Sequence, residues 1–212
     1  MLNLNRSQRQ ISLGRLATSE NRRGWVGNKT DAELVSEKAK GYLNQGFNWA
    51  ESISLSFKDY LGIEDSLIPK LATGFGGGIG RKGSLCGAFT GAVMAVGMKI
   101  GRTDPKDKEA VAKVYGKCQE FWSQFEKEFG SNVCYNLIGA RLDNEEERQK
   151  WLASGGMEKC AKIVDKTAQM LCDLLNEIQW RYWYVWQRQE RRSVSTLRIS
   201  GSGRGVERVD FL

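Results

Sequence analysis

Residues 73–92 read TGFGGGIGRKGSLCGAFTGA, and half of them are glycine or alanine. Such a density of glycine directly before an apolar segment restricts the possible folds strongly. It indicates either that backbone N–H groups approach an anionic group or that two chain segments come into close contact. A nucleotide-binding loop, a site for sulfur chemistry and tight packing are the three interpretations to weigh.

The rest of the chain favours helices. Its 212 residues include only two prolines, 41% are hydrophobic, and runs of alternating polarity are few. We expect an all-α fold: one compact helical bundle with a glycine-rich loop before a buried central helix, plus N- and C-terminal extensions. No stretch reaches the roughly eighteen apolar residues of a membrane helix, since the best candidate, residues 88–96, is far too short.

Capping residues and apolar spacing predict the helix positions. The segment from Leu85 to Ile100 is apolar on nearly all sides, as expected for the buried central helix. Its glycines each cost about 1 kcal/mol relative to alanine, so a close neighbour or a bound group must compensate. The other predicted helices run from Thr30 or Asp31 to Leu43, over 49–60 and 65–72, from Asp104 to Phe129, around Cys134 with Ser131 as its cap, over 143–152, and from Met157 to about Arg192.

The basic residues are concentrated at the two ends of the chain, whose formal charge is +7. We predict a basic N-terminal arm (1–30), a helical domain (31–177) and an aromatic-basic C-terminal extension with a tail (178–212). The stretch WRYWYVWQRQERR in this extension favours a protein partner or a homo-oligomer, bound through residues 178–212 and 1–30. Nucleic acid is the second choice, and contact with a membrane surface is the third.

Histidine is absent, which excludes Ser-His-Asp and Cys-His catalytic pairs and any His-ligated metal or haem. A conventional hydrolase or transferase therefore has no visible machinery, and whether the chain is an enzyme stays open. Five cysteines, an odd number in a chain without a signal peptide, favour a reducing compartment, and we expect a cytoplasmic protein.

The nucleotide interpretation of the glycine loop is weak. Residues 78–83 satisfy G-x-G-x-x-G, but the preceding segment is expected to be helical and no βαβ pattern surrounds it. A Walker loop is also excluded, because Arg81-Lys82 precedes Gly83 and no Gly-Lys-Ser/Thr ends the loop.

Sulfur chemistry fits the loop better. Ser84 is expected to cap the next helix, so that Cys86 lies in its first turn, where the helix dipole and nearby Arg81 favour a thiolate. Cys134 has the same setting after Gly130-Ser131. The backbone N–H groups of Gly76, Gly77, Gly78 and Gly80 are candidates for binding the sulfur or an anionic group that it holds. The alternative is that both cysteines are small core residues at a crowded crossing, as expected for Cys118 and Cys172.

At these residues the chain resembles the C-GCAxxG-C-C family of redox-active proteins. The similarity is carried by GFNWAES (46–52), ATGFGGGIG (72–80), CGAFTG (86–91), FGSNVC (129–134) and EKC (158–160), and covers about residues 31–175. A more distant likeness is to split-Soret cytochromes, without their haem motif. The resemblance implies a helical domain whose four clustered cysteines bind an iron–sulfur cluster or act as redox thiols.

Only three of the four family cysteines are present. The resemblance implies that Cys86, Cys134 and Cys160 are metal ligands or, without metal, redox thiols, whereas Trp49 replaces the first cysteine. Three thiolates could still hold an iron–sulfur cluster with an open ligand position, or a single metal ion. The Glu51 carboxylate could supply the missing ligand. Alternatively, the protein binds no metal. Glu51 as an ordinary exposed side chain is the alternative.

Two functions follow from these features. The first is a redox-active or iron–sulfur- or metal-binding protein, acting as an electron-transfer or accessory subunit of a larger assembly. The second is a non-catalytic interaction subunit on a degenerate family fold, whose basic aromatic extensions bind protein partners or nucleic acid.

Overall fold

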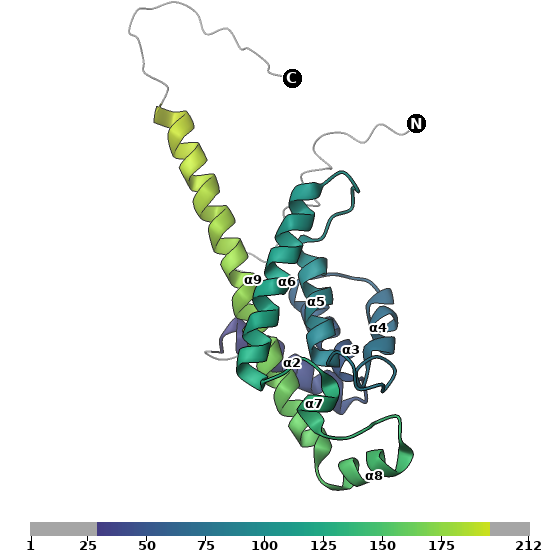
Figure 1. Cartoon of the computed structure of the whole chain (residues 1–212). Coiled ribbons are helices and arrows are strands. Elements are labelled where there is room, and N and C mark those ends of the chain that lie inside the picture. The colour runs from purple at the N-terminus through teal and green to yellow at the C-terminus, as the bar shows by residue number, and fades with distance from the viewer. Residues whose placement is uncertain (1–28, 196–212) are drawn as a thin grey trace, which may run out of the picture. The chain divides into compact units, whose positions relative to one another are not determined.

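The computed structural model describes residues 29–195, with side chains described as far as residue 177. Within 29–195 all regular elements are helical, which confirms the all-α prediction (Figure 1). The α-helices are α2 (Asp31–Asn44), α3 (Trp49–Tyr60), α4 (Leu67–Ala72), α5 (Gly87–Ile100), α6 (Lys108–Phe129), α7 (Cys134–Ile138), α8 (Glu145–Ala153) and α9 (Gly156–Ser195), and a 3-10 turn, η1 (Thr73–Phe75), follows α4.

The chain divides into two units between Leu175 and Asn176, and the bundle described below belongs to the first unit. The predicted N-terminal arm lies almost wholly outside the described residues, as do the side chains of the predicted C-terminal extension. Their proposed partners therefore stay predictions. No described helix combines the length and the hydropathy that crossing a membrane requires.

Helix α3 lies at the centre of the bundle and contacts α2, α4 and α5. All eight residues from 50 to 57 are buried, although three of them are serines. Ser54 and Ser56 donate hydrogen bonds to carbonyl oxygens of their own helix, those of Ala50 (2.7 Å) and Ile53 (2.8 Å). The serines therefore enter the core with their hydroxyl groups satisfied, and their small size lets neighbouring helices approach.

The central helix predicted after the glycine loop is α5, and the first half of this helix is buried. It crosses α3 at Gly91, where a Cβ atom would come within 2.7 Å of the Ala50 carbonyl oxygen and 3.0 Å of Ile53 Cβ. Close helix approach thus compensates for glycine at this position. Gly97 has nothing within 4 Å of such a Cβ, and no contact explains it.

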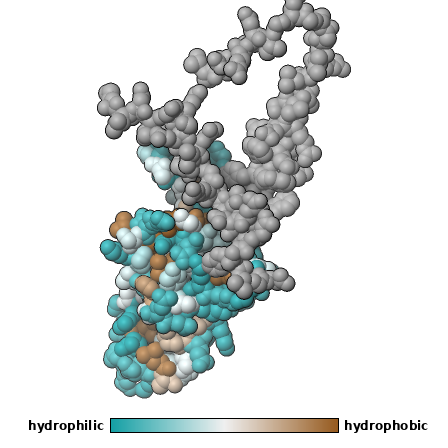
Figure 2. Space-filling model, turned by 180° about the vertical axis from the view of Figure 1, so that it is seen from behind, coloured by the Kyte–Doolittle hydropathy of each residue, from teal (hydrophilic) through white to brown (hydrophobic). Residues whose placement is uncertain are grey.

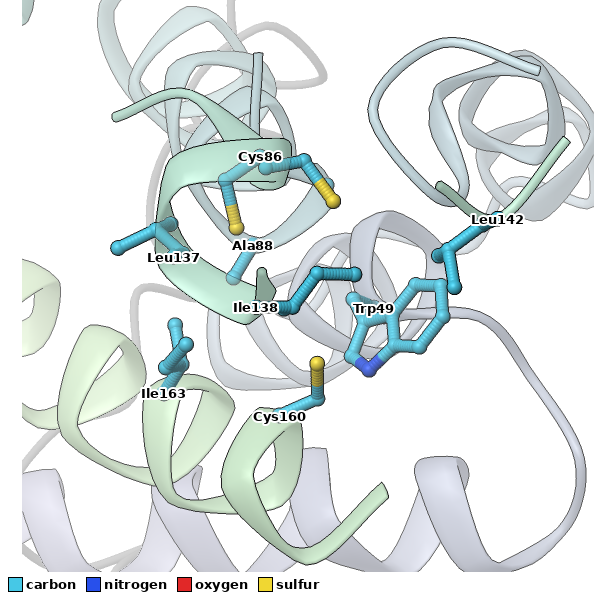
Figure 3. Close-up of a pocket in the computed structure, with 10 residues that line it drawn as sticks. Trp49, Cys86, Ala88, Leu137, Ile138, Leu142, Cys160 and Ile163 are labelled. Atoms are coloured by element: carbon cyan, nitrogen blue, oxygen red, sulfur yellow. The ribbon is translucent and has the colours of Figure 1, made fainter. Parts of the chain in front are cut away.

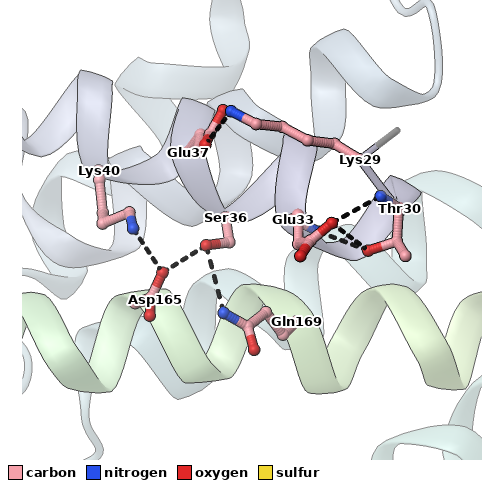
Figure 4. Close-up of polar contacts among 8 residues, drawn as sticks. All are labelled: Lys29, Thr30, Glu33, Ser36, Glu37, Lys40, Asp165 and Gln169. Atoms are coloured by element: carbon pink, nitrogen blue, oxygen red, sulfur yellow. Dashed lines mark hydrogen bonds and ion pairs between the residues drawn. The ribbon is translucent and has the colours of Figure 1, made fainter. Parts of the chain in front are cut away.

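Two sets of side-chain contacts, one aromatic and one polar, hold the outer helices. Phe89 of α5 stacks on Phe121 of α6 with ring centroids 5.9 Å apart. Helix α9 is joined to α2 by polar contacts: Ser36 donates to Asp165, and Lys40 Nζ lies 2.9 Å from the same carboxylate (Figure 4). The face of the molecule shown in Figure 2 carries its apolar residues in small groups among hydrophilic ones.

Several helix starts differ from the predictions. Cys86, not Ser84, is the N-cap of α5, and Val133, not Ser131, is the N-cap of α7. Helix α6 begins only at Lys108, because the Asp107 side chain accepts from the Ala110 N–H and caps it there. The start of α2 at Asp31 with Thr30 as its cap is confirmed.

Candidate functional site

The glycine loop winds in the left-handed sense. Five consecutive residues, 77–81, have φ between 58° and 74°, and two of them, Ile79 and Arg81, are not glycine. Each non-glycine residue in this conformation costs about 1–2 kcal/mol, and a β-branched one such as Ile79 is a clear outlier. The surrounding hydrogen bonds must therefore impose the turn.

Backbone hydrogen bonds close the loop on itself. The N–H groups of Gly76, Gly80 and Gly83 donate to the carbonyl oxygens of Thr73 (3.3 Å), Gly74 (2.9 Å) and Gly77 (3.2 Å). The predicted ligand groups of Gly76 and Gly80 are thus engaged within the loop. Among the described residues, the Gly77 and Gly78 N–H groups have no hydrogen-bond partner.

An antiparallel bridge between Leu85 and Val133 joins the two segments that carry Cys86 and Cys134. The Cys86 N–H donates to the Asn132 carbonyl oxygen (2.8 Å), and the Cys134 N–H donates to that of Ser84 (2.6 Å). Because the bridge is antiparallel, Cys86 lies opposite Asn132 and Cys134 lies opposite Ser84, so the two cysteines flank the bridged pair on opposite sides. Residues almost 50 positions apart are joined in this way.

Three cysteines from three helices line one cavity (Figure 3). Cys86 caps α5, Cys134 begins α7 and Cys160 lies in the first turns of α9. Figure 3 shows Cys86 and Cys160 on opposite sides of the cavity, with Trp49 along another side. The full lining consists of Trp49, Cys86, Gly87, Ala88, Cys134, Leu137, Ile138, Leu142, Cys160 and Ile163.

The three thiols are neutral at pH 7. Burial raises the pKa of Cys86 and outweighs the backbone N–H groups of Phe89 and Ala88, which act in the opposite direction. Burial, and secondarily the other cysteines, raise the pKa of Cys134 and of Cys160 to about 12. The expectation of a thiolate in the first helical turn is therefore wrong, because desolvation of the charged form exceeds the effect of the helix terminus.

The basic residues beside the loop do not reach the cavity. Neither Arg81 nor Lys82 is among its lining residues, and Lys82 Nζ lies 3.0 Å from Asp143 Oδ2. Arg81 is exposed. The positive charge expected near Cys86 is thus directed elsewhere, which contributes to the neutrality of the thiol.

The side chain of Trp49, the residue that the sequence resemblance aligns with the first family cysteine, forms part of the cavity wall. Its ring meets that of Trp151 edge to face, with centroids 6.5 Å apart. The indole Nε1 atoms of both tryptophans are buried without a hydrogen-bond partner. A buried donor without an acceptor is unfavourable, so the Trp49 N–H, in the wall of the cavity, points to an acceptor beside the cysteines, whereas Trp151 does not line this cavity.

The cavity has a volume of about 10 Å³, the room of about one water molecule. A cubane of four iron and four sulfur atoms does not fit this space unless the apolar side chains move outward. No group of three or more cysteine, histidine or acidic side chains is arranged to hold a metal ion in the part of the chain that the structure describes. The cysteine sulfur atoms are suitable ligands for an iron–sulfur cluster, but the cavity is too small to hold one.

Glu51 is neither exposed nor directed at the cysteines. It is 9% exposed, its Oε2 accepts from the Asn48 N–H (2.7 Å), and its Oε1 accepts from the Thr73 hydroxyl. The carboxylate therefore forms a capping box at the start of α3 and fixes that helix to the beginning of the glycine loop.

The remaining cysteines, Cys118 and Cys172, lie apart from the cavity, and none of the five cysteines forms a disulfide. Cys172 is fully buried in the core, as predicted, whereas Cys118 is partly exposed. The sequence analysis missed Trp151, whose ring contacts that of Trp49. It also missed three lysines of α9, at positions 159, 162 and 166, which line a second cavity. The spacing of these lysines, which places them on one helix face, was the available signal.

Comparisons with known proteins bear on the same residues. Residues 47–174 match the family model described as "Putative redox-active protein (C_GCAxxG_C_C)". A protein of Archaeoglobus fulgidus, described as uncharacterized, is 27% identical over 154 residues, which are 69% of this chain and 97% of that protein. No solved structure matches the chain.

Proposed function

Because the chain belongs to the C_GCAxxG_C_C family, we propose that it is a redox protein that works through the thiols of Cys86, Cys134 and Cys160. One observation carries this proposal: the three cysteines, remote in sequence, line a single cavity. The two cysteines outside the family pattern, Cys118 and Cys172, are not part of it.

The chemistry that the arrangement supports is reversible disulfide formation. Cys86 and Cys134 are the proposed pair, since both line the cavity and the Leu85–Val133 bridge joins the segments that carry them. With a low-molecular-weight disulfide as oxidant, one thiol forms a mixed disulfide and releases one small thiol. The second thiol then displaces another small thiol, so two electrons leave the protein. Cys160 can exchange into the resulting disulfide.

Attack requires a thiolate, whereas burial keeps these thiols protonated. The reaction therefore depends on opening of the cavity, and it should be slow in the closed state. Apolar side chains such as Leu137 and Ile138 control this access.

Redox titration in glutathione buffers, followed by alkylation in denaturant and mass spectrometry, tests the proposal. We expect Cys86 and Cys134 to lose alkylation together as the potential rises, while Cys172 stays alkylated. Cys86→Ser combined with Cys160→Ser should prevent disulfide formation at Cys134, and Cys118→Ser combined with Cys172→Ser is the matched control. Full alkylation of Cys86 and Cys134 at every potential would contradict the proposal.

An iron–sulfur cluster or a single metal ion held by the same three thiols is the second candidate. The buried indole N–H of Trp49 favours it, since such a donor can bond to a sulfide or another acceptor beside the cysteines. Anaerobic reconstitution with iron and sulfide, followed by absorbance near 400 nm and metal analysis, tests it. Trp49→Cys introduces a cysteine at the first family position and should increase the bound iron if the cavity can open.

An electron-transfer or accessory role in a larger assembly belongs to the same proposal and depends on the sequence of residues 178–212. The alternative is a non-catalytic interaction subunit. A colourless, metal-free protein whose three cavity cysteines can be replaced together without effect on its redox behaviour would favour that alternative.

A further inference from the structure

A second cavity, of about 560 Å³, lies between the end of α6, the helix α7 and the first half of α9. This volume falls in the range of cavities that bind small molecules, roughly 300–1,000 Å³. Its lining residues are Glu128, Phe129, Asn136, Leu137, Lys159, Lys162, Ile163 and Lys166. We call it the lysine groove.

The groove is predominantly basic. Lys159, Lys162 and Lys166 follow one another along one face of α9, and all three are exposed. Within the described residues none of them forms an ion pair. Glu128 is the one carboxylate in the lining, so three positive charges face one negative charge. Charge complementarity therefore favours a ligand with two or more negative charges.

The rest of the lining is suited to an organic ligand. The half-buried ring of Phe129 packs on Phe125, with centroids 4.6 Å apart, and presents an aromatic wall. Leu137 and Ile163 form an apolar floor, and the Asn136 side chain adds a hydrogen-bonding group. Apolar walls with a few polar groups are typical of sites for small organic molecules.

The floor of the groove is also a wall of the cysteine cavity, because Leu137 and Ile163 line both spaces. Each lies one helical turn after a cysteine, Leu137 after Cys134 and Ile163 after Cys160. Lys159 is adjacent to Cys160 in sequence, and its charge opposes the rise of the Cys160 pKa that burial causes. A molecule in the groove would therefore lie against the thiol site.

We propose that the lysine groove binds an organic phosphate with an aromatic or apolar body: the phosphate contacts the lysines of α9, and the body packs on Phe129, Leu137 and Ile163. The binding goes beyond the proposed redox function and does not depend on it. Its effect on thiol reactivity does rest on that function.

Three probes separate the parts of this ligand. Flavin mononucleotide carries both a phosphate and an aromatic ring system, riboflavin lacks the phosphate, and pyrophosphate lacks the ring. We expect flavin mononucleotide to bind about tenfold or more tightly than either of the others, measured by flavin fluorescence and by calorimetry. Equal affinity for flavin mononucleotide and either partial probe would overturn the proposal, as would the absence of binding at about 1 mM.

A charge-matched pair of variants tests the location. Lys162→Gln with Lys166→Gln should weaken flavin mononucleotide binding about tenfold. Lys70→Gln with Lys106→Gln removes the same charge from exposed positions outside the groove and should change the affinity less than about twofold. Equal losses in the two variants would indicate a general charge effect and overturn the site. None of these readouts involves a thiol, so they fail or succeed independently of the redox proposal.

Discussion

Gly78 lies directly against Cys134: a Cβ atom on Gly78 would stand 2.7 Å from Cys134 Cβ and 2.7 Å from the Ser84 backbone nitrogen. The left-handed backbone of Gly78, with φ of 74°, adds a second restriction. We predict that Gly78→Ala lowers the free energy of unfolding by about 2–5 kcal/mol, combining backbone strain and overpacking. Urea denaturation measures the loss.

Gly80→Ala is the matched control for this contact. Gly80 also has a left-handed φ, of 58°, but nothing lies within 4 Å of its would-be Cβ. Gly80→Ala should lower the free energy of unfolding only through backbone strain, by about 1–2 kcal/mol. Equal losses in both variants would mean that the contact between the loop and Cys134 does not stabilise the site.

The crossing of α3 and α5 gives a prediction in which two alanine substitutions have opposite signs. Gly91→Ala places a methyl group 2.7 Å from the Ala50 carbonyl oxygen and should destabilise the protein by about 1–3 kcal/mol. Gly97→Ala, in open space on the same helix, should stabilise it by about 0.5–1 kcal/mol through helix propensity. Thermal and urea unfolding of both variants check the signs, and a stabilising Gly91→Ala would disprove the close crossing.

The neutral thiols predict a loss of stability in alkaline solution. The Cys160 thiol has a pKa of about 12 in the folded protein and about 8.5 when unfolded. Below pH 8.5 both states hold the proton; above it the unfolded state loses the proton first, and its free energy falls. Stability should therefore decrease by about 1.4 kcal/mol per pH unit for this thiol between about pH 9 and 12.

Cys160→Ser removes this contribution and should make the decline of stability with pH shallower by the same amount. Tyr42, whose pKa is raised to about 12, and the other titrating groups provide a background common to both proteins. Urea midpoints measured at half-unit steps of pH give the two slopes. Parallel slopes would show that the Cys160 thiol is not buried in solution.

Local sequence signals were enough to predict much of the fold. The predicted limits of α3, residues 49–60, agree with the structure, because Asn48 supplies a cap and apolar residues recur every three or four positions. The start of α5 was placed too early, since Leu85 is taken up by the bridge to Val133, a long-range pairing that no local pattern encodes.

The site was less predictable than the fold. The grouping of Cys86, Cys134 and Cys160 came from the family resemblance, whereas their protonation state depends on burial by Leu137, Ile138 and Leu142, which only the folded chain brings together. Ile79 and Arg81 adopt left-handed conformations that their residue types disfavour, so the shape of the loop could not be deduced from glycine content alone.

Glu51 and Glu33 occupy the same capping-box position in α3 and α2, but Glu51 is buried and Glu33 is exposed. Glu51→Ala removes the carboxylate that accepts from the part-buried Asn48 N–H and from the Thr73 hydroxyl, and should cost about 1–2 kcal/mol. Glu33→Ala should cost less than half as much, because water replaces the lost carboxylate.

A double-mutant cycle with Thr73→Ala separates the two roles of Glu51. If its carboxylate fixes α3 to the glycine loop, the effects of Glu51→Ala and Thr73→Ala on the urea midpoint should fall short of additivity, since both remove the same hydrogen bond. Thr73→Ala combined with Glu33→Ala should be additive. Additivity in both pairs would reduce Glu51 to a helix cap and leave the loop held by its own backbone.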